Sequence, residues 1–283
     1  MWMATNRLPI FKKSDPLSDS DWSMPPAQLG RMESLHQQAA QLSFIGRCIG
    51  LIASLYFRKS KEDSDFAVRD ARDRVRDDSC CYLESLSREG LVHYEFQGFE
   101  DVATWSHSLI CANHPSILDA IALFSKIPQV DCVVGKNPLR DPLFSYTARM
   151  ANYIPGEPAI SMVKECRRRL ENGANVIIFP EGTRTSSGAL NPFHDGFALA
   201  AMKAGAHIRP VFIECNSLFL SKGFSFFKAA PGPIRYRLST AGIFRAGSGE
   251  NARDFSKRIE SYFRRRLRRD GNRILRDRTP DEP

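Results

Sequence analysis

The chain lacks several features that would place it in a specialised class of protein. Its seven cysteines form no CxxC pair and show no spacing with histidine that predicts a zinc site. The first residues contain no apolar stretch long enough for a secretory signal, so we expect reduced thiols and a cytosolic compartment. With 42% hydrophobic and 25% charged residues, the composition is that of an ordinary globular protein.

Long hydrophobic runs are also missing. The best candidate for a membrane helix covers residues 42–57, but it is short for a bilayer span and contains Arg47. Arg58, Lys59 and Lys61 follow it, as basic residues do where an apolar helix face meets lipid headgroups. A core helix and a helix lying in the membrane interface both fit this segment, and we favour the interfacial helix.

Basic residues greatly outnumber acidic ones near the C-terminus. Of the net charge of +8, a balance of +7 lies between Arg253 and Arg278, where eleven Lys or Arg face four Asp or Glu. Such a segment binds nucleic acid, adheres to an anionic membrane or forms a solvated helix face. No regular interleaving of aromatic and basic residues indicates a platform for stacking bases, so we expect no nucleic-acid partner.

Changes of pattern along the chain predict four segments. Residues 1–27 are rich in Pro, Ser and Asp and predict a flexible leader. Residues 28–89 predict a helical hairpin, with helices over about 27–57 and 64–87. Residues 90–245 form the predicted catalytic domain, and residues 246–283 a basic helix, over about 252–269, with a tail.

Short apolar runs alternate with helical periodicity between residues 90 and 245. This alternation predicts an α/β fold with a largely parallel sheet flanked by helices. The predicted strands cover residues 91–96, 108–112, 131–135, 175–179, 208–214 and 234–238, and the predicted helices cover residues 117–125, 142–150, 160–171 and 197–204.

Polar residues follow the second strand in the block 113–119 (NHPSILD). Ligands meet an open α/β sheet at the loops after the carboxyl ends of its strands. Pro115 disfavours the helical conformation at His114 and suits the first turn of the helix that carries Asp119. The carboxylate can then fix the imidazole tautomer and leave the other ring nitrogen free to accept a proton from a hydroxyl. Alone, the pattern favours the alternative of a loop histidine with local hydrogen bonds beside an aspartate that suits a helix start.

A second polar block, residues 179–185 (FPEGTRT), follows the strand 175–179. Gly182 permits a tight turn, Arg184 offers a bidentate fork suited to phosphate, and the hydroxyls of the neighbouring threonines can add donors. The alternative is a surface turn in which Arg184 pairs with Glu181.

Together the two blocks resemble the glycerolipid acyltransferase superfamily, whose best-known members are the 1-acylglycerol-3-phosphate (lysophosphatidate) acyltransferases. Members carry NHxxxxD and FPEGTRS blocks at a similar separation. Between these blocks lies a lysine-bearing segment, matched by residues 134–139 (VGKNPL), and after them a V-P-V-type block, echoed by residues 209–213 (RPVFI). The resemblance covers about residues 90 to 240.

The resemblance implies that His114 is the catalytic base, Asp119 its orienting carboxylate and Arg184 the phosphate contact. It implies attack of a lipid hydroxyl on the thioester of acyl-CoA or acyl-carrier protein, without a metal, another cofactor or a covalent acyl-enzyme. Lys136 fits a phosphate contact and a solvated lysine at a strand end equally well. The implied substrate-binding residues are Asn113, Lys136, Glu181, Gly182, Thr183 and Arg184.

The sequence departs from relatives that bind phosphorylated acceptors in two places. A family block resembling G-x-x-F-I-x-R corresponds to residues 151–157, which end without an arginine; Arg149 and Arg140 are candidates to compensate. Residues 193–196 (FHDG) lack the lysine that often precedes this glycine. Both departures remove positive charge near the expected acceptor site. A lysophosphatidate-like glycerolipid is the favoured acceptor, and a non-phosphorylated or non-glycerolipid acceptor is the alternative.

Two other classes of protein use some of the same residues. A metal-dependent phosphoesterase would use His114, Asp119 and Glu181, but such sites need a denser set of ligands than six scattered histidines provide. A protein without catalysis would use the arginine run 264–269 to bind nucleic acid or a membrane. Membrane adhesion fits an acyltransferase as well, so we expect a cytoplasmic protein held peripherally on the anionic cytoplasmic face of the membrane.

Overall fold

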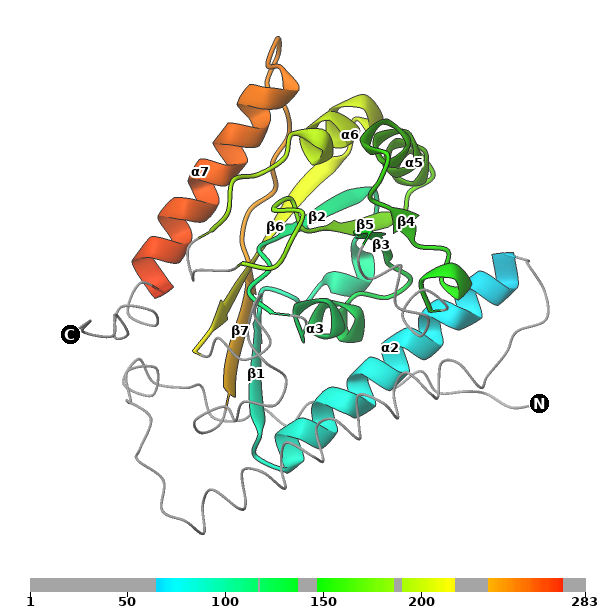
Figure 1. Cartoon of the computed structure of the whole chain (residues 1–283), viewed down its shortest axis with the longest axis vertical. Helices are drawn as coiled ribbons and strands as arrows, with labels where there is room; N and C mark the ends of the chain where they lie inside the picture. Colours follow the sequence, from blue (N-terminus) through cyan, green and yellow to red (C-terminus); the bar gives the residue numbers. More distant parts are fainter. Residues whose placement is uncertain (1–64, 117, 137–146, 186–189, 217–233, 272–283) are drawn as a thin grey trace.

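The computed structural model describes residues 65–116, 118–136, 147–185, 190–216 and 234–271, with side chains described as far as Leu267. Within this part of the chain the strands form one seven-stranded sheet with the order β1-β7-β6-β2-β5-β3-β4 (Figure 1). The strands are Val92–Gln97 (β1), Ser108–Ala112 (β2), Asp131–Val134 (β3), Ile154–Pro155 (β4), Asn175–Ile178 (β5), His207–Cys215 (β6) and Ile234–Thr240 (β7).

Neighbouring strands of this sheet run parallel, with the single exception of the pair β6 and β7. Strands β3, β4, β5, β2 and β6 therefore point their carboxyl ends toward one edge of the sheet, where the loops that follow them gather. The expected α/β fold with a largely parallel sheet is confirmed.

Helices cover both faces of the sheet (Figure 1). Helices α2 and α3 pack on one face, and α5, α6 and α7 pack on the other. A short 3-10 helix, η2, follows β1. The helices are Asp65–Arg88 (α2), Val102–Thr104 (η2), Leu118–Lys126 (α3), Ala159–Glu171 (α5), Gly196–Ala204 (α6) and Ala252–Gly271 (α7).

Strand β2 lies in the middle of this layered core, and all five of its residues are buried. Ile110 and Ala112 pack with α2 and α3, whereas Leu109 and Cys111 pack with α5, α6 and α7. Burial on both faces explains why the strand is a continuous apolar run and does not alternate with polar residues. The strand ends at the point where the polar block begins.

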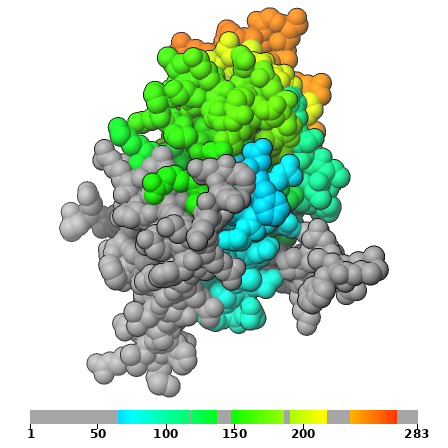
Figure 2. All heavy atoms as spheres, turned by 90° about the vertical axis from the view of Figure 1, so that its right-hand side faces the viewer, coloured from blue at the N-terminus to red at the C-terminus, as the bar shows by residue number. Residues whose placement is uncertain are grey.

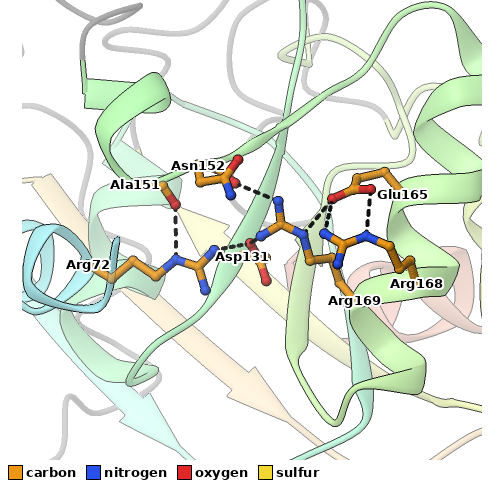
Figure 3. Close-up of polar contacts among 7 residues, drawn as sticks. All are labelled: Arg72, Asp131, Ala151, Asn152, Glu165, Arg168 and Arg169. Atoms are coloured by element: carbon orange, nitrogen blue, oxygen red, sulfur yellow. Dashed lines mark hydrogen bonds and ion pairs between the residues drawn. The ribbon is translucent and has the colours of Figure 1, made fainter. Parts of the chain in front are cut away.

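A buried ion network attaches α2 to the sheet. The Asp131 carboxylate, at the start of β3, accepts hydrogen bonds from Arg72 of α2 and from Arg169 of α5, the latter at 2.7 Å (Figure 3). Arg72 Nε also donates to the carbonyl of Ala151 at 3.0 Å. Figure 2, turned to show this side of the molecule, places the cyan atoms of α2 next to green atoms from the middle of the chain.

Most predicted elements appear within two residues of their expected bounds. The predicted helix 64–87 is α2, but its hairpin partner and the leader 1–27 lie outside the described residues. Of the predicted helix 142–150 only residues 147–150 are described, and they are helical. The sequence did not predict β4 or η2, which are too short for a periodic pattern to indicate. In the described part, no helix has the length and apolarity needed to span a membrane, and the segment 42–57 lies outside that part.

Candidate active site

His114 and Asp119 meet at the carboxyl end of β2. The loop after β2 carries the histidine and the first turn of α3 carries the aspartate, so that His114 Nδ1 lies 2.9 Å from Asp119 Oδ2. The carboxylate is fully buried, whereas the imidazole is 18% exposed. An ionised carboxylate accepts a hydrogen bond from Nδ1 only when Nδ1 carries the proton. The lone pair of the neutral ring then lies on Nε2, which is the state that a general base needs.

The backbone of the same loop holds the Asp119 carboxylate in place. The amide of Ser116 donates to Asp119 Oδ2 at 2.7 Å, so this one oxygen receives both hydrogen bonds. Burial raises the pKa of Asp119, while the bonds from His114 and from the Ser116 amide act in the opposite direction. These donors favour the ionised form that orients the imidazole.

Phe179, the first residue of the second polar block, fixes the plane of the imidazole. Its ring stacks on that of His114, with centroids 4.0 Å apart and an interplanar angle of 20°. Sequence reasoning gave Phe179 no role, because an apolar residue at a strand end is expected to be part of the core. Its place at the start of a polar block was the available signal.

Glu181 connects the two polar loops. Its oxygens accept hydrogen bonds from the amide of His114 at 2.9 Å, from the Thr185 hydroxyl at 3.0 Å and from the Asn191 amide at 2.9 Å. The amide of Thr185 donates back to the carbonyl of His114 at 2.8 Å. Glu181 is only 3% exposed, whereas Gly182 and Thr183 at the tip of the turn are exposed. Because both of its oxygens accept hydrogen bonds, Glu181 holds the two loops together.

Asn113 makes a similar connection on the other side of β2. Its side-chain amide donates to the carbonyl of Ile213 on β6, and its side-chain oxygen accepts from the amide of Ile213, both at 2.8 Å. The side chain is buried. Asn113 therefore pins the end of β2 to β6 beside His114, whereas the sequence predicted a substrate contact.

Gly182 occupies the turn at the tip of the second block with φ of 67°, a conformation that side-chain-bearing residues rarely adopt. A Cβ atom there would lie 3.1 Å from the ring of His194, whose amide donates to the carbonyl of Pro180. Thr183 is exposed and Arg184 is half-buried. Sequence reasoning had used His194 only as part of a departure from the family pattern.

The comparisons with known proteins point to one family. The family model described as "Acyltransferase" matches residues 93–214, a range that contains both polar loops. Residues 93–214 are therefore similar to acyltransferases. Among relatives, a 1-acyl-sn-glycerol-3-phosphate acyltransferase of Helicobacter pylori is 32% identical over 43% of this chain and 54% of its own length. One of Pseudomonas aeruginosa is 24% identical over 60% of this chain and 67% of its own length. The chain spans about half the length of the curated relatives it matches first.

The fold of the chain has a solved counterpart. The chain is similar in fold to the crystal structure of the 1-acyl-sn-glycerophosphate (LPA) acyltransferase from Thermotoga maritima, with a TM-score of 0.66. The match covers 88% of the present chain and 100% of the Thermotoga chain. The two sequences are 19% identical, so this likeness concerns the fold.

Lys136 lies at the same edge of the sheet, two residues after β3. Its side chain is 59% exposed, and its ammonium group lies 3.5 Å from the carboxylate of Glu157, which follows β4. Glu157 stands at the end of the block where an arginine was expected, so a negative charge takes that place and pairs with Lys136. Arg149 is exposed, and Arg140 lies outside the described residues.

Across the described ranges, no group of three or more His, Cys, Asp or Glu is placed to hold a metal ion. What the site offers is one imidazole, a buried carboxylate that fixes its tautomer, and a scaffold of backbone hydrogen bonds between two loops. That arrangement suits the removal of a proton from a hydroxyl.

Proposed function

We propose that this chain transfers a fatty acyl group from acyl-CoA or acyl-carrier protein to the hydroxyl of a lipid, with a lysophosphatidate-like glycerolipid as the favoured acceptor. The observation that carries the proposal is the 2.9 Å contact between His114 Nδ1 and the buried carboxylate of Asp119, within the residues that the acyltransferase family model matches. It leaves Nε2 as the basic nitrogen at the carboxyl edge of the sheet.

In the proposed reaction, His114 Nε2 takes the proton of the acceptor hydroxyl as its oxygen attacks the thioester carbonyl carbon. The new C–O bond forms, the C–S bond breaks, and the imidazolium returns the proton to the departing thiolate. The Asp119 carboxylate stabilises the imidazolium that exists between these two proton transfers. The products are an ester and a free thiol, and His114 ends in its starting state.

Arg184 is the proposed contact for an acceptor phosphate, since it follows the loop that holds His114 in place. A guanidinium matches the geometry of a phosphate group with two parallel hydrogen bonds. The pairing of Lys136 with Glu157 leaves less positive charge at this edge than a free lysine would. An acceptor without a phosphate is therefore the second candidate.

We further propose that the enzyme is held peripherally on an anionic membrane face, in part by α7. Arg253, Lys257 and Arg265 are exposed and recur at spacings of four and eight residues, which places them along one stripe of the helix. Arg258 and Arg264 instead pair with Glu250 and Glu260 at 2.8 and 2.7 Å. Each exposed basic residue near such a surface contributes about 1 kcal/mol of attraction.

Vesicle sedimentation tests this attachment. Reversing Lys257 and Arg265 to Glu should lower the fraction bound to vesicles that contain phosphatidylserine, and raising the salt should have the same effect. A double reversal of Lys164 and Lys203, exposed on α5 and α6, is the matched control and should change binding less. Equal binding by both double variants would exclude α7 as the contact.

The catalytic proposal is tested by replacing His114 with Ala and measuring transfer from several acyl donors to lysophosphatidate and to monoacylglycerol. We expect turnover to be nearly abolished while the circular dichroism spectrum is unchanged. His93→Ala, a half-buried histidine on β1, is the control and should retain activity. Turnover near that of the unmodified protein in folded His114→Ala would refute the assignment, and the two acceptors distinguish the phosphorylated from the non-phosphorylated substrate.

A further inference from the structure

Helix α7 is bonded to the surroundings of the active site, although it lies beyond the residues that the family model matches. Its apolar stripe of Phe255, Ile259 and Phe263 is buried against the face of the sheet that α5 and α6 also cover. Figure 1 shows α7 lying along this face beside α6. Glu260 follows Ile259 at the border of the stripe, and 21% of its side chain is exposed.

The Glu260 carboxylate joins α7 to the segment 190–195, which leads from the second polar block into α6. One oxygen, Oε2, accepts a hydrogen bond from the amide of Phe193 at 3.2 Å. The other, Oε1, pairs with Arg264, one turn further along α7, at 2.7 Å. Arg264 thus holds the carboxylate in the orientation that faces the amide.

The side chain of Phe193 supports the same contact. It is 7% exposed, and its ring meets that of Phe263 on α7 edge-on, with centroids 5.3 Å apart. A second edge-on contact, at 6.0 Å, joins it to Phe197 on α6. The backbone of Phe193 therefore cannot move away from Glu260 without exposing apolar surface to water.

The residues on either side of Phe193 bind the second polar block. The amide of Asn191 donates to Glu181 Oε2, and the amide of His194 donates to the carbonyl of Pro180, both at 2.9 Å. The backbone donors of this short segment thus face two ways, with that of Phe193 directed at α7 and the others at the second polar block. The segment is held from both sides.

We propose that Glu260 is a positioning residue for the catalytic histidine. It fixes the segment that keeps Glu181 in place, and Glu181 in turn accepts the hydrogen bond from the amide of His114 at 2.9 Å. This inference rests on the proposed function for the effect on turnover, but not for the effect on the loops. Glu260 acts on the reaction only through these backbone contacts.

Two substitutions separate the reach of Glu260 from its charge. Glu260→Gln keeps the length of the side chain and an oxygen that can accept from Phe193, whereas Glu260→Asp keeps the charge but is one CH2 group shorter. If the bond to Phe193 is what matters, Glu260→Gln should behave like the unmodified protein and Glu260→Asp like Glu260→Ala. A residue that only stabilises α7 through its pair with Arg264 would give the opposite order.

Amide hydrogen exchange, followed by NMR, reports on the loops directly. Loss of one hydrogen bond makes local opening easier, so the amides of Asn191 and His114 should exchange roughly tenfold faster in Glu260→Ala. With detergent-dispersed substrate, kcat should fall roughly tenfold and the KM of the acyl donor should stay unchanged. The pH dependence of kcat should keep its shape, because the contact between His114 and Asp119 is not altered.

Glu250→Ala is the matched control. Glu250 also accepts from a backbone amide, that of Gly247 at 2.7 Å, and from an arginine of α7, Arg258 at 2.8 Å. These partners lie at the start of α7, so the variant should leave kcat and the exchange at Asn191 unchanged. Unchanged exchange in folded Glu260→Ala, or equal effects of both alanine variants, would overturn the inference. If Glu260→Ala does not fold, the same measurement on Glu260→Asp decides.

The exchange measurement also separates this inference from the proposed function. If the unmodified protein transfers no acyl group to any lipid but exchange at His114 responds to the loss of Glu260, the positioning contact stands and the proposed reaction fails. If transfer depends on His114 but its amide does not respond, the reaction stands and the role of Glu260 fails.

Discussion

Replacing Asp119 with Asn tests what the buried carboxylate contributes. Both hydrogen bonds to Asp119, from His114 Nδ1 and from the Ser116 amide, end on the same oxygen, Oδ2. An asparagine can place its single oxygen at that position and keep both bonds. Its NH2 group then takes the place of Oδ1, which accepts no hydrogen bond from the described residues.

The variant should therefore keep the imidazole tautomer and lose only the negative charge. Opposite unit charges about 4 Å apart attract each other by about 4 kcal/mol at an effective dielectric constant of about 20. The asparagine retains the hydrogen bond to His114, so part of this attraction to the imidazolium remains. We expect a loss of about 2–3 kcal/mol of transition-state stabilisation, or roughly a hundredfold fall in kcat.

The stability of Asp119→Asn should change little. Burial raises the pKa of Asp119, which means that the folded protein bears a cost for its charge, and the amide removes that cost. The free energy of unfolding at neutral pH should stay within about 1 kcal/mol of the unmodified protein, unless the NH2 group is left unpaired.

Single-turnover transfer assays on Asp119→Asn, His114→Ala and Asp195→Asn separate the possibilities. Asp195, exposed before α6, is the control for loss of a negative charge. We expect intermediate activity for Asp119→Asn, nearly none for His114→Ala and unchanged activity for the control. If Asp119→Asn is as inactive as His114→Ala, the tautomer is not preserved and the placement of its oxygen is wrong. A fall of less than about threefold would show that the charge is not used.

Three further perturbations address the surroundings of the site. Arg184→Ala should mainly raise the acceptor KM, and Arg184→Lys should not restore it, because a point charge does not reproduce a bidentate fork; steady-state kinetics decide this. Asp131→Asn removes the carboxylate that Arg72 and Arg169 share, although Arg169 keeps Glu165, and should lower the free energy of unfolding by about 3 kcal/mol, whereas Asp70→Asn, in a half-exposed pair, should lower it by about 1 kcal/mol or less in the same urea titration. Glu181→Gln replaces one of two acceptor oxygens by a donor, and each of these oxygens faces a backbone amide and the Thr185 hydroxyl, so thermal unfolding should occur at a lower temperature and kcat should fall.

Local patterns in the sequence were sufficient to predict most of the fold. Strands β2 and β5 are short apolar runs, each followed within three residues by polar side chains, and α5 shows helical periodicity, so each could be recognised without its neighbours. Strand β4 has only two residues, and it is recognised as a strand because they pair with β3. No period exists in so short a segment, and its place in the sheet depends on a partner some twenty residues away.

The sequence predicted the chemistry of the candidate site better than it predicted the role of each residue. His114 and Asp119 are five residues apart, and their contact follows from a loop that leads into a helix. Glu181 and Asn113 reach partners 67 and 100 residues away, and these contacts occupy atoms that the sequence had assigned to substrate. A motif identifies which side chains lie at a sheet edge, but only the fold shows which of them already form hydrogen bonds within the protein.

The precision of the site therefore depends on the register of the central strands. Parallel pairing sets Cys111 of β2 against Ile178 of β5, and from there each chain continues directly into its polar loop. A slip of one residue would shift these loops by about 3.3 Å and turn every side chain to the opposite face. His114 could then not accept and donate backbone bonds with the second loop, or stack on Phe179, as it does here. Substitutions inside β2 or β5 that loosen the pairing should thus lower kcat without touching the acceptor, because they act on the distance between His114 and the loop that holds it.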